Sequence, residues 1–329
     1  MLRHLCFALP ALPFTDTVKL NISGEEIEEI DGVKDVKSTF DADDTRAVVA
    51  ESHRLGMRVA AHCRGSKSVR DGLAAGIDVM FHCDFTTREC REGIVAAPDL
   101  LLGPSLGFLD RIAPFGIEGD PRFDAPAKLA ASIETHLHLL EMGGKDLVSR
   151  VGIGGDYGFA VTPHGDNAYD CELYVRLLGM TPLDALRCAT TSGARFMRGS
   201  PCGDEGNGPR IGELCAGFAA DLIAVRGDAT VDVRCLREVE LVISNGRLAR
   251  LEPGLGAAAS APLCNEALEG AFVWASANEL RELLIAEFVS RFPEREDEAE
   301  IALSSSLGER KPLVTAKTGG SRGYGATSP

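Results

Sequence analysis

Apolar runs alternate with amphipathic helical segments between residues 17 and 200, and this rhythm constrains the fold more than any other feature of the chain. The apolar runs that we expect to form buried strands are 17–23, 57–63, 77–83, 99–108 and 149–156. The segments with helical spacing are 43–56, 66–76, 86–97, 125–144, 167–179 and 181–197. Apolar strands separated by helices are typical of a parallel sheet with helices packed outside it. The sequence therefore predicts an α/β fold with five parallel strands.

Residues that favour helix ends support these assignments. The clearest example is the segment 181–197, which opens with Thr181 as its N-cap and Pro182 at the first helical position. Asp184 follows three residues after the cap, where an acidic side chain favours the first turn. We therefore expect this helix to begin at Pro182.

The pattern changes after residue 200. The segments 212–225 and 239–251 read as short antiparallel strands, and the second contains an Asn-Gly turn at 245–246. From Glu252 the chain is rich in Gly, Ala and Pro, and we expect one helix within 268–292 followed by a disordered tail. The predicted organisation is an irregular segment 1–16, an α/β domain 17–200, β-strands in 211–252 and a C-terminal extension 253–329.

Composition limits the partners and the compartment. The formal net charge is −15 and no block of Lys or Arg occurs in the body of the chain, so we expect no binding to nucleic acid or to an anionic membrane. No apolar run approaches the roughly 18–20 residues of a membrane span. The apolar start is short and interrupted by prolines, which disfavours a secretory leader. The ten cysteines fall singly, with none in a CxxC pair, which predicts reduced thiols in a cytoplasmic protein.

Four polar side chains lie in or at the ends of the predicted strands. Lys19 is within the first strand, His62 and His82 end the second and third, and Asp156 ends the fifth. Chemistry in parallel α/β folds sits at the C-terminal ends of the strands, so we expect these side chains to meet at one edge. Imidazole and carboxylate suit a divalent ion such as zinc. The set predicts a metal site.

Each residue taken alone has a simpler interpretation. A strand-end histidine is more often a hydrogen-bonded core residue, and an aspartate such as Asp156 between glycines is more often a turn residue. Lys19 alone could extend to the rim of the sheet. The metal-site hypothesis rests on all four falling at the same end of successive strands.

A second histidine pair is a weaker candidate. His136 and His138 form an HxH pattern, but the apolar residues around them have helical spacing. Two positions along a helix differ by roughly 200° of rotation, so the two imidazoles diverge. We expect no metal there. The segments "GGK" and "GIGGDYG" lack the spacing of phosphate-binding and dinucleotide-binding loops.

Several motifs together resemble those of the amidohydrolase superfamily, in its imidazolonepropionase-like and prolidase-like branch. The resemblance covers about residues 17–250 and rests on "VKLNISG", "VAAHCRG", "GIDVMFHCDF", "APDLLLGPSLGF", "GGDYGFAVTPHGDNAYD" and "GELCAGFAADLIAVRGD". The family fold is a (β/α)8 TIM barrel with a composite β-sandwich domain. The resemblance implies a partial barrel here, with about five of eight βα units (strands 4–8) and a small β-sandwich remnant.

The resemblance also implies roles for individual residues. Lys19 matches the lysine that becomes carboxylated and bridges two metals, and His62 and His82 match ligands on the next two strands. Asp156 matches a metal ligand that acts as general base on metal-activated water. His164, in the loop after that aspartate, is implied as a substrate contact, and Arg64 is a weaker candidate for the same role. The implied cofactor is a divalent metal, with Zn²⁺ favoured, and the implied partner is a small-molecule substrate.

The sequence departs from the family pattern upstream of Lys19. Only eighteen residues precede it, the only upstream histidine is His4, and the family's strand-1 HxH pair has no counterpart. The chain thus resembles the C-terminal part of an amidohydrolase, whether through a shortened gene, alternative initiation or a degenerate paralogue. We expect exposed sheet edges to favour homo-oligomers. Two hypotheses remain: a hydrolase of amide, cyclic amide or dipeptide-like bonds with weakened activity, or a non-catalytic remnant that binds a ligand or partner chain.

Overall fold

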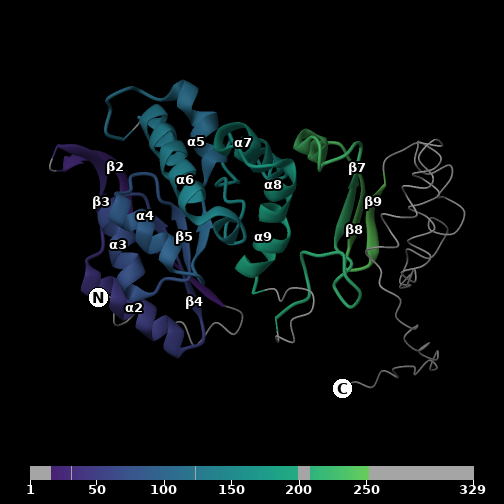
Figure 1. The fold of residues 1–329 in the computed structure, drawn as a ribbon, viewed down its shortest axis with the longest axis horizontal. Helices are drawn as coiled ribbons and strands as arrows, with labels where there is room; N and C mark the ends of the chain where they lie inside the picture. The colour runs from purple at the N-terminus through teal and green to yellow at the C-terminus, as the bar shows by residue number, and fades with distance from the viewer. Residues whose placement is uncertain (1–15, 31, 123, 199–207, 252–329) are drawn as a thin grey trace, which may run out of the picture. The chain divides into compact units, whose positions relative to one another are not determined.

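A parallel sheet lies among the helices of the N-terminal part of the described chain (Figure 1). The computed structural model describes residues 16–30, 32–122, 124–198 and 208–251. Within them the sheet has the strand order β1-β4-β5-β6, and its neighbouring strands pair in parallel. The strands are β1 (Thr17–Asn21), β4 (Arg58–Cys63), β5 (Val79–His82) and β6 (Leu101–Gly103). The predicted α/β class with a parallel sheet is confirmed.

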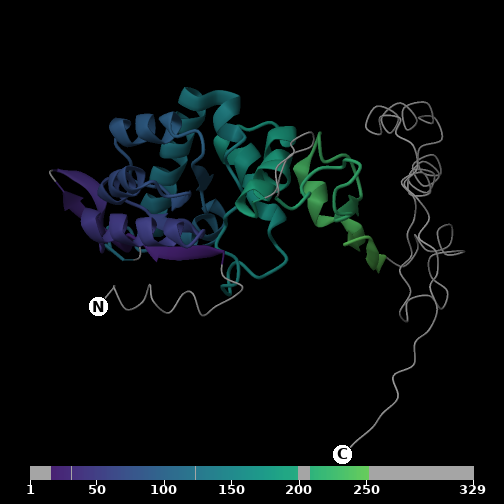
Figure 2. The same cartoon turned by 90° about the horizontal axis from the view of Figure 1, so that it is seen from below.

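Helices connect and surround these strands, as Figures 1 and 2 show. The α-helices are α2 (Ala42–Arg54), α3 (Ser66–Ala75), α4 (Arg88–Ala96), α5 (Leu106–Ile112), α6 (Ala125–Val148), α7 (Ala168–Leu178), α8 (Pro182–Ala189) and α9 (Thr191–Phe196), and the 3-10 helices are η2 (Ala113–Phe115) and η3 (Val233–Arg237). Capping fixes several starts, because a side-chain oxygen accepts from an otherwise unpaired backbone N–H. Asp124 accepts from the N–H of Ala127 at 3.0 Å, and Thr181 accepts from that of Asp184 at 3.1 Å, as the sequence predicts for α8.

The two faces of the sheet bury different amounts of apolar surface. Val59, Ala61 and Met80 point toward the helices and join the main core with residues such as Ile94 and Leu173. On the opposite face Ala60, Val79 and Leu101 form a small cluster with Phe81 and Phe196. A fully buried aliphatic side chain stabilises the fold by about 1.5–3 kcal/mol. Most of the hydrophobic stabilisation therefore lies between sheet and helices.

Two predicted strands are shorter than the sequence indicates. The run 99–108 forms a strand only over Leu101–Gly103, because Ser105 adopts a left-handed conformation (φ 57°) from which α5 begins. The run 149–156 contributes a single parallel bridge, between Val151 and Leu102, rather than a fifth full strand. Glycines dominate the rest of that run, and glycine weakens strands.

Two helices also differ from expectation. The segment 181–197 forms α8 and α9, separated at Thr190 (φ −116°, ψ −90°). Helix α6 continues beyond the predicted end at residue 144, although Gly144 (φ 53°) interrupts its helical geometry. Backbone breaks of this kind depend on tertiary packing, which the spacing of apolar residues does not reveal.

A β-hairpin that the sequence does not predict follows β1. It pairs β2 (Ser23–Ile30) with β3 (Val33–Ser38) in antiparallel fashion. Its strands, "SGEEIEEI" and "VKDVKS", are rich in charged residues, so the sequence does not single out the two apolar side chains that anchor the hairpin. Ile27 and Val36 are buried against Phe85, in the loop after β5. The hairpin thereby covers the C-terminal end of the sheet.

A separate antiparallel sheet follows residue 208, with the order β7 (Leu222–Val225), β8 (Val239–Ser244) and β9 (Arg247–Leu251). Asn245 (φ 49°) and Gly246 (φ 74°) form the tight turn between β8 and β9, so the predicted Asn-Gly turn is confirmed. The predicted strand 212–225 is limited to its last four residues.

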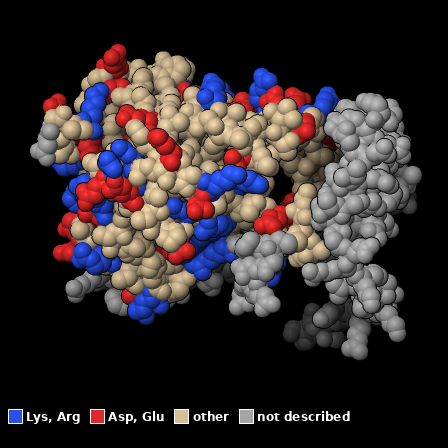
Figure 3. Space-filling view, in the orientation of Figure 1, with Lys and Arg blue, Asp and Glu red and all other residues tan. Residues whose placement is uncertain are grey.

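One expectation about cysteine is corrected. Six cysteines of the described chain have free thiols: Cys63, Cys83, Cys90, Cys171, Cys188 and Cys235. Cys215, however, is disulfide-bonded, which single spacing along the chain did not indicate. In the described ranges no helix is both long and apolar enough to cross a membrane. Acidic and basic side chains intermingle on the face shown in Figure 3.

The predicted domain boundaries stay predictions. The N-terminal segment up to residue 15, the helix expected within 268–292 and the tail after it lie outside the described residues.

We expect Gly65→Ala to destabilise the protein by about 1–3 kcal/mol, because overpacking forces backbone shifts of that cost. Gly65 caps α3, and a Cβ atom there would lie 2.2 Å from the carbonyl oxygen of Val36 in β3. The measurement is the free energy of unfolding in urea. Gly24→Ala is the matched control, since its nearest neighbours would lie at 3.8 and 3.9 Å. Equal stabilities of the two variants would contradict a tight contact between hairpin and helix.

Candidate active site

His62 and His82 meet at the C-terminal end of the sheet. Strand alternation places His62 on the same face as Ala60 but gives His82 the phase of Met80, which points toward the helices. The left-handed backbone of His82 (φ 75°) breaks that alternation. Its ring then lies edge-on to the His62 ring, with 4.2 Å between centroids. Non-glycine residues in this conformation are strained and cluster at functional sites.

Both imidazoles are held in the neutral form. Burial, reinforced by the nearby Arg64 cation, lowers the pKa of His62 to about 4. The same two causes lower the pKa of His82 well below its ordinary value. Neutral imidazole is the form that binds metals. The Nδ1 atom of His82 is buried and has no hydrogen-bond partner among the described residues.

Lys19 and Asp156 approach the same point. Lys19 Nζ lies 4.5 Å from the centre of the Phe81 ring, and burial lowers the pKa of its ammonium group. Asp156 also has a left-handed backbone (φ 52°), and its Oδ2 lies 4.0 Å from His82 Nε2. Burial raises the pKa of Asp156, while the Arg64 and Lys19 cations oppose that rise. The structure therefore brings all four residues of the predicted site into one neighbourhood.

The donor types fit a divalent metal better than their spacing does. Two neutral imidazoles and a carboxylate suit zinc. Within the described part of the chain, however, no three His, Cys, Asp or Glu side chains converge closely enough to hold an ion. Metal binding would require the side chains to draw together.

Arg64 is the electrostatic centre of the region. Its guanidinium is 2% exposed and forms ion pairs with Asp84, which is fully buried, and with Glu25 of β2 (2.8 Å from Nε to Oε2). Glu25 also lies 3.2 Å from His62 Nε2 and 3.3 Å from Lys128 Nζ of α6. One carboxylate thus contacts a guanidinium, an ammonium and an imidazole.

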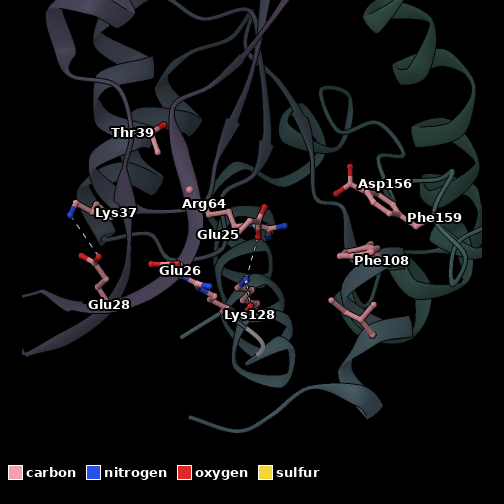
Figure 4. Close-up of a pocket in the computed structure, with 13 residues that line it drawn as sticks. Glu25, Glu26, Glu28, Lys37, Thr39, Arg64, Phe108, Lys128, Asp156 and Phe159 are labelled. Carbon is pink, nitrogen blue, oxygen red and sulfur yellow. Dashed lines mark hydrogen bonds and ion pairs between the residues drawn. The ribbon is translucent and has the colours of Figure 1, made fainter. Parts of the chain in front are cut away.

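Glu25, Arg64 and Lys128 border a cavity of about 700 Å³ (Figure 4). Figure 4 shows Glu25, Arg64 and Lys128 on one side, with Asp156 and two phenylalanines on the other. Phe108 of α5 and Phe159 pack with ring centroids 4.9 Å apart. The cavity therefore has a charged wall on one side, and on the other an aromatic wall that also carries Asp156.

Some residues of this cavity were not foreseen from the sequence. Glu25 follows β1 closely, but its role depends on the unpredicted hairpin. Lys128 had a detectable signal: with Ser132 and His136 it forms a buried polar stripe at four-residue spacing on α6. Phe108 was assigned to a strand that ends before it. Only the helical spacing could have singled out Lys128 in advance.

No histidine of the described chain is among the residues that line the cavity. His164 is exposed and packs near Gly158, where a Cβ would lie 3.1 Å from its ring, so its role as a substrate contact stays a prediction. His136 is buried in α6 with Nδ1 2.7 Å from the carbonyl oxygen of Ser132. His136 and His138 share this helix, in agreement with the prediction that their HxH pattern is not a strand pair.

Asp170 fixes the loop that carries Asp156. Fully buried at the start of α7, it accepts hydrogen bonds from the backbone N–H groups of Gly107 (3.1 Å) and Gly154 (3.0 Å). A Cβ at Gly155 would approach its oxygens to 2.7 and 2.8 Å, so only glycine fits there. Asp170 thereby ties the start of α5 to the segment that precedes Asp156.

We expect the stability of the wild type, relative to Asp170→Asn, to fall as pH rises from about 4 to about 7. Burial, opposed by the two backbone donors, raises the pKa of Asp170 to about 7. The unfolded carboxyl titrates near 4, so in this window the folded state holds a proton that the unfolded state releases, and rising pH favours unfolding. Urea unfolding of both proteins across pH 4–8 measures the difference. Parallel profiles would contradict a protonated, buried Asp170.

No family model matches the chain. Among curated proteins, ochratoxinase from Aspergillus niger is 25% identical over 220 residues, which make up 66% of this chain and 43% of the relative. The chain thus spans less than half the length of that curated relative.

Solved structures show a shared fold. The crystal structure of A. niger ochratoxinase matches with a TM-score of 0.59 and 21% identity, covering 73% of this chain and 51% of that one. A Xaa-Pro dipeptidase with bound methionine matches with a TM-score of 0.61 and 22% identity, covering 76% of this chain and 58% of that one. A putative prolidase from Bifidobacterium longum matches with a TM-score of 0.63 and 22% identity, covering 78% of this chain and 62% of that one.

Proposed function

We propose that this chain, an amidohydrolase-type protein by its motifs and its structural neighbours, is a metal-dependent hydrolase of carbon–nitrogen bonds. The observation that carries the proposal is the meeting of Lys19, His62, His82 and Asp156 beside a cavity at one end of a parallel sheet. The bond is an amide, cyclic amide or dipeptide-like bond. Similar structures carry the names ochratoxinase, Xaa-Pro dipeptidase, phenylurea hydrolase and molinate hydrolase, which supports this class.

Each of the four residues supplies one ligand to a divalent metal, and zinc is the metal we favour. His62 and His82 supply neutral imidazoles, and Asp156 supplies a carboxylate. The lowered pKa of Lys19 favours the free amine, which reacts with carbon dioxide to give an anionic carbamate in place of a cation that cannot ligate. When bound, the metal supplies a Lewis acid that activates water and polarises the substrate carbonyl.

Asp156 serves as the general base. It accepts the proton of the attacking water while the oxygen bonds to the carbonyl carbon, and it then delivers that proton to the leaving nitrogen as the carbon–nitrogen bond breaks. The products are an acid and an amine. A raised pKa makes the carboxylate a stronger base, and its 38% exposure on the cavity gives a substrate access to it.

The finer architecture belongs to this proposal. The parallel sheet corresponds to strands 4–8 of a (β/α)8 barrel, with Val151 marking the reduced last strand, and β7–β9 correspond to a β-sandwich remnant. Strand β1 forms one edge of the described sheet, and unpaired edges promote association. A homo-oligomer formed along that edge is the expected assembly.

A non-catalytic binding protein is the second candidate. The observation that favours it is the spacing of the donors, since the described side chains form no group of three at metal-binding distance. In that case the cavity binds a ligand without hydrolysing it.

Metal analysis separates the two candidates. We expect purified protein supplied with zinc and bicarbonate to hold at least one metal ion per chain, and His62→Ala and His82→Ala to lose most of it because each removes a ligand. His53→Ala is the matched control, because His53 is exposed and pairs with Asp78 instead (2.8 Å). A wild-type protein that retains no metal under these conditions would eliminate the metal-dependent hydrolase.

Asp156→Asn tests the base. We expect this variant to lose at least ~10²-fold in hydrolysis, since proton transfer by a positioned side chain contributes about that much or more. Metal content should stay mostly intact, because the amide oxygen still ligates weakly and three other ligands remain. A panel of dipeptides and N-acyl amino acids, followed by release of amine, provides the assay. Activity persisting in the variant would show that another group is the base.

A further inference from the structure

Glu25 lies where two buried cations converge. Its carboxylate contacts Arg64 Nε at 2.8 Å and Lys128 Nζ at 3.3 Å, and all three residues line the cavity. The side chains of Arg64 and Lys128 are only 2% and 6% exposed, whereas that of Glu25 is 55% exposed. Two desolvated cations are thus matched by an anion that remains largely in contact with solvent.

Arg64 and Lys128 have further partners that hold them in place, whereas the position of Glu25 depends on the hairpin. Arg64 pairs with the buried Asp84, and its backbone N–H donates to Ser23 Oγ at 2.8 Å. Lys128 sits in the first turn of α6 and also donates to the carbonyl oxygen of Arg122 at 3.3 Å. Glu25 is carried by the two-stranded hairpin, so it can leave while Arg64 and Lys128 stay in place.

Glu25 also fits this position imperfectly. Arg64 Nε is close to its carboxylate, yet this buried N–H has no well-directed hydrogen bond among the described residues. A buried donor without a partner is costly, and a charge-assisted bond to a better placed oxygen recovers that cost. A carboxylate entering from the cavity could approach Arg64 at a more favourable angle.

We propose that Arg64 and Lys128 form a subsite for the carboxylate of a small ligand, and that Glu25 occupies it until the ligand displaces it. Because this deepens the proposed function, the substrate becomes an amide that carries a free carboxylate. Its apolar group contacts the Phe108–Phe159 pair on the opposite wall. A neutral ligand that displaced Glu25 would leave Lys128 without its counter-ion and Arg64 with Asp84 alone, so Glu25 also selects against uncharged compounds.

The probes are N-benzoylglycine and its neutral counterpart N-benzoylglycinamide, which share the aromatic ring and amide bond but differ in the carboxylate. We expect the acid to bind the full chain at least about tenfold more tightly, as charged hydrogen bonds of ordinary strength imply. Titration calorimetry measures both affinities. Equal affinities, or no binding of either compound, would overturn the subsite.

Variants test the displacement itself. Glu25→Gln should bind N-benzoylglycine about tenfold more tightly than the wild type does, because the internal competitor is neutralised. Glu29→Gln is the matched control: Glu29 lies on the same strand β2, is exposed and is not among the residues that line the cavity. We expect its affinity to equal that of the wild type. An unchanged affinity in Glu25→Gln would refute the displacement.

Lys128→Gln should weaken binding about tenfold, whereas Lys128→Arg should retain most of it, which keeps the test valid if loss of the charge impairs folding.

Repeating the titration in Asp156→Asn separates this subsite from the proposed activity. Tight, carboxylate-dependent binding in that variant would uphold the subsite, and a wild type that binds as tightly but hydrolyses neither probe would disfavour the hydrolase. Hydrolysis of both probes by the wild type at equal efficiency would uphold the hydrolase and disfavour the subsite.

Discussion

The buried guanidinium of Arg64 is the group on which the arrangement of the site depends. A cation removed from water is tolerated only with close counter-charges, because the desolvation penalty is several kcal/mol per ion. Arg64 satisfies this by pairing with Asp84 beyond β5 and with Glu25 on the hairpin. The backbone oxygen of Asp84 accepts in turn from Thr135 Oγ1 of α6 at 2.8 Å. One side chain at the end of β4 therefore joins the sheet, the hairpin and the long helix.

The same charge shapes the chemistry around it. Arg64 lowers the pKa values of His62 and His82 and opposes the rise caused by burial at Asp156. It thereby favours neutral imidazoles beside an ionised carboxylate at neutral pH. This is the protonation pattern that both a metal centre and a hydrolytic base require. The sequence had marked Arg64 as a weaker candidate for substrate contact; its larger effect in the structure is electrostatic.

Local patterns in the sequence predicted what depends on local physics. Helix starts such as Pro182 and the turn at Asn245 follow from capping and turn preferences within a few residues. The parallel sheet follows from apolar runs separated by helices. The ends of strands were less predictable, because His82 and Ser105 adopt left-handed conformations that non-glycine residues seldom adopt.

The candidate site shows the same division. Lys19, His62, His82 and Asp156 could be found because strand ends of a parallel sheet share an edge. Glu25 and Lys128 could not be paired in advance, since they lie 103 positions apart and meet only when the hairpin folds over α6. Whether the four strand-end residues hold a metal depends on shifts of side chains that neither spacing nor motif specifies.

The bonds made by Asp170 have a mechanical consequence for the cavity. Gly107 directly precedes Phe108, and Gly154 lies two residues before Asp156, so one carboxylate holds the aromatic wall and the loop that carries Asp156 together. The hairpin on the opposite side is anchored mainly by Ile27 and Val36, far fewer buried side chains than the main core contains. One wall of the cavity is therefore held rigidly, whereas the wall formed by the hairpin is more easily displaced. Adjustment to occupants of different size takes place on the side that carries Glu25.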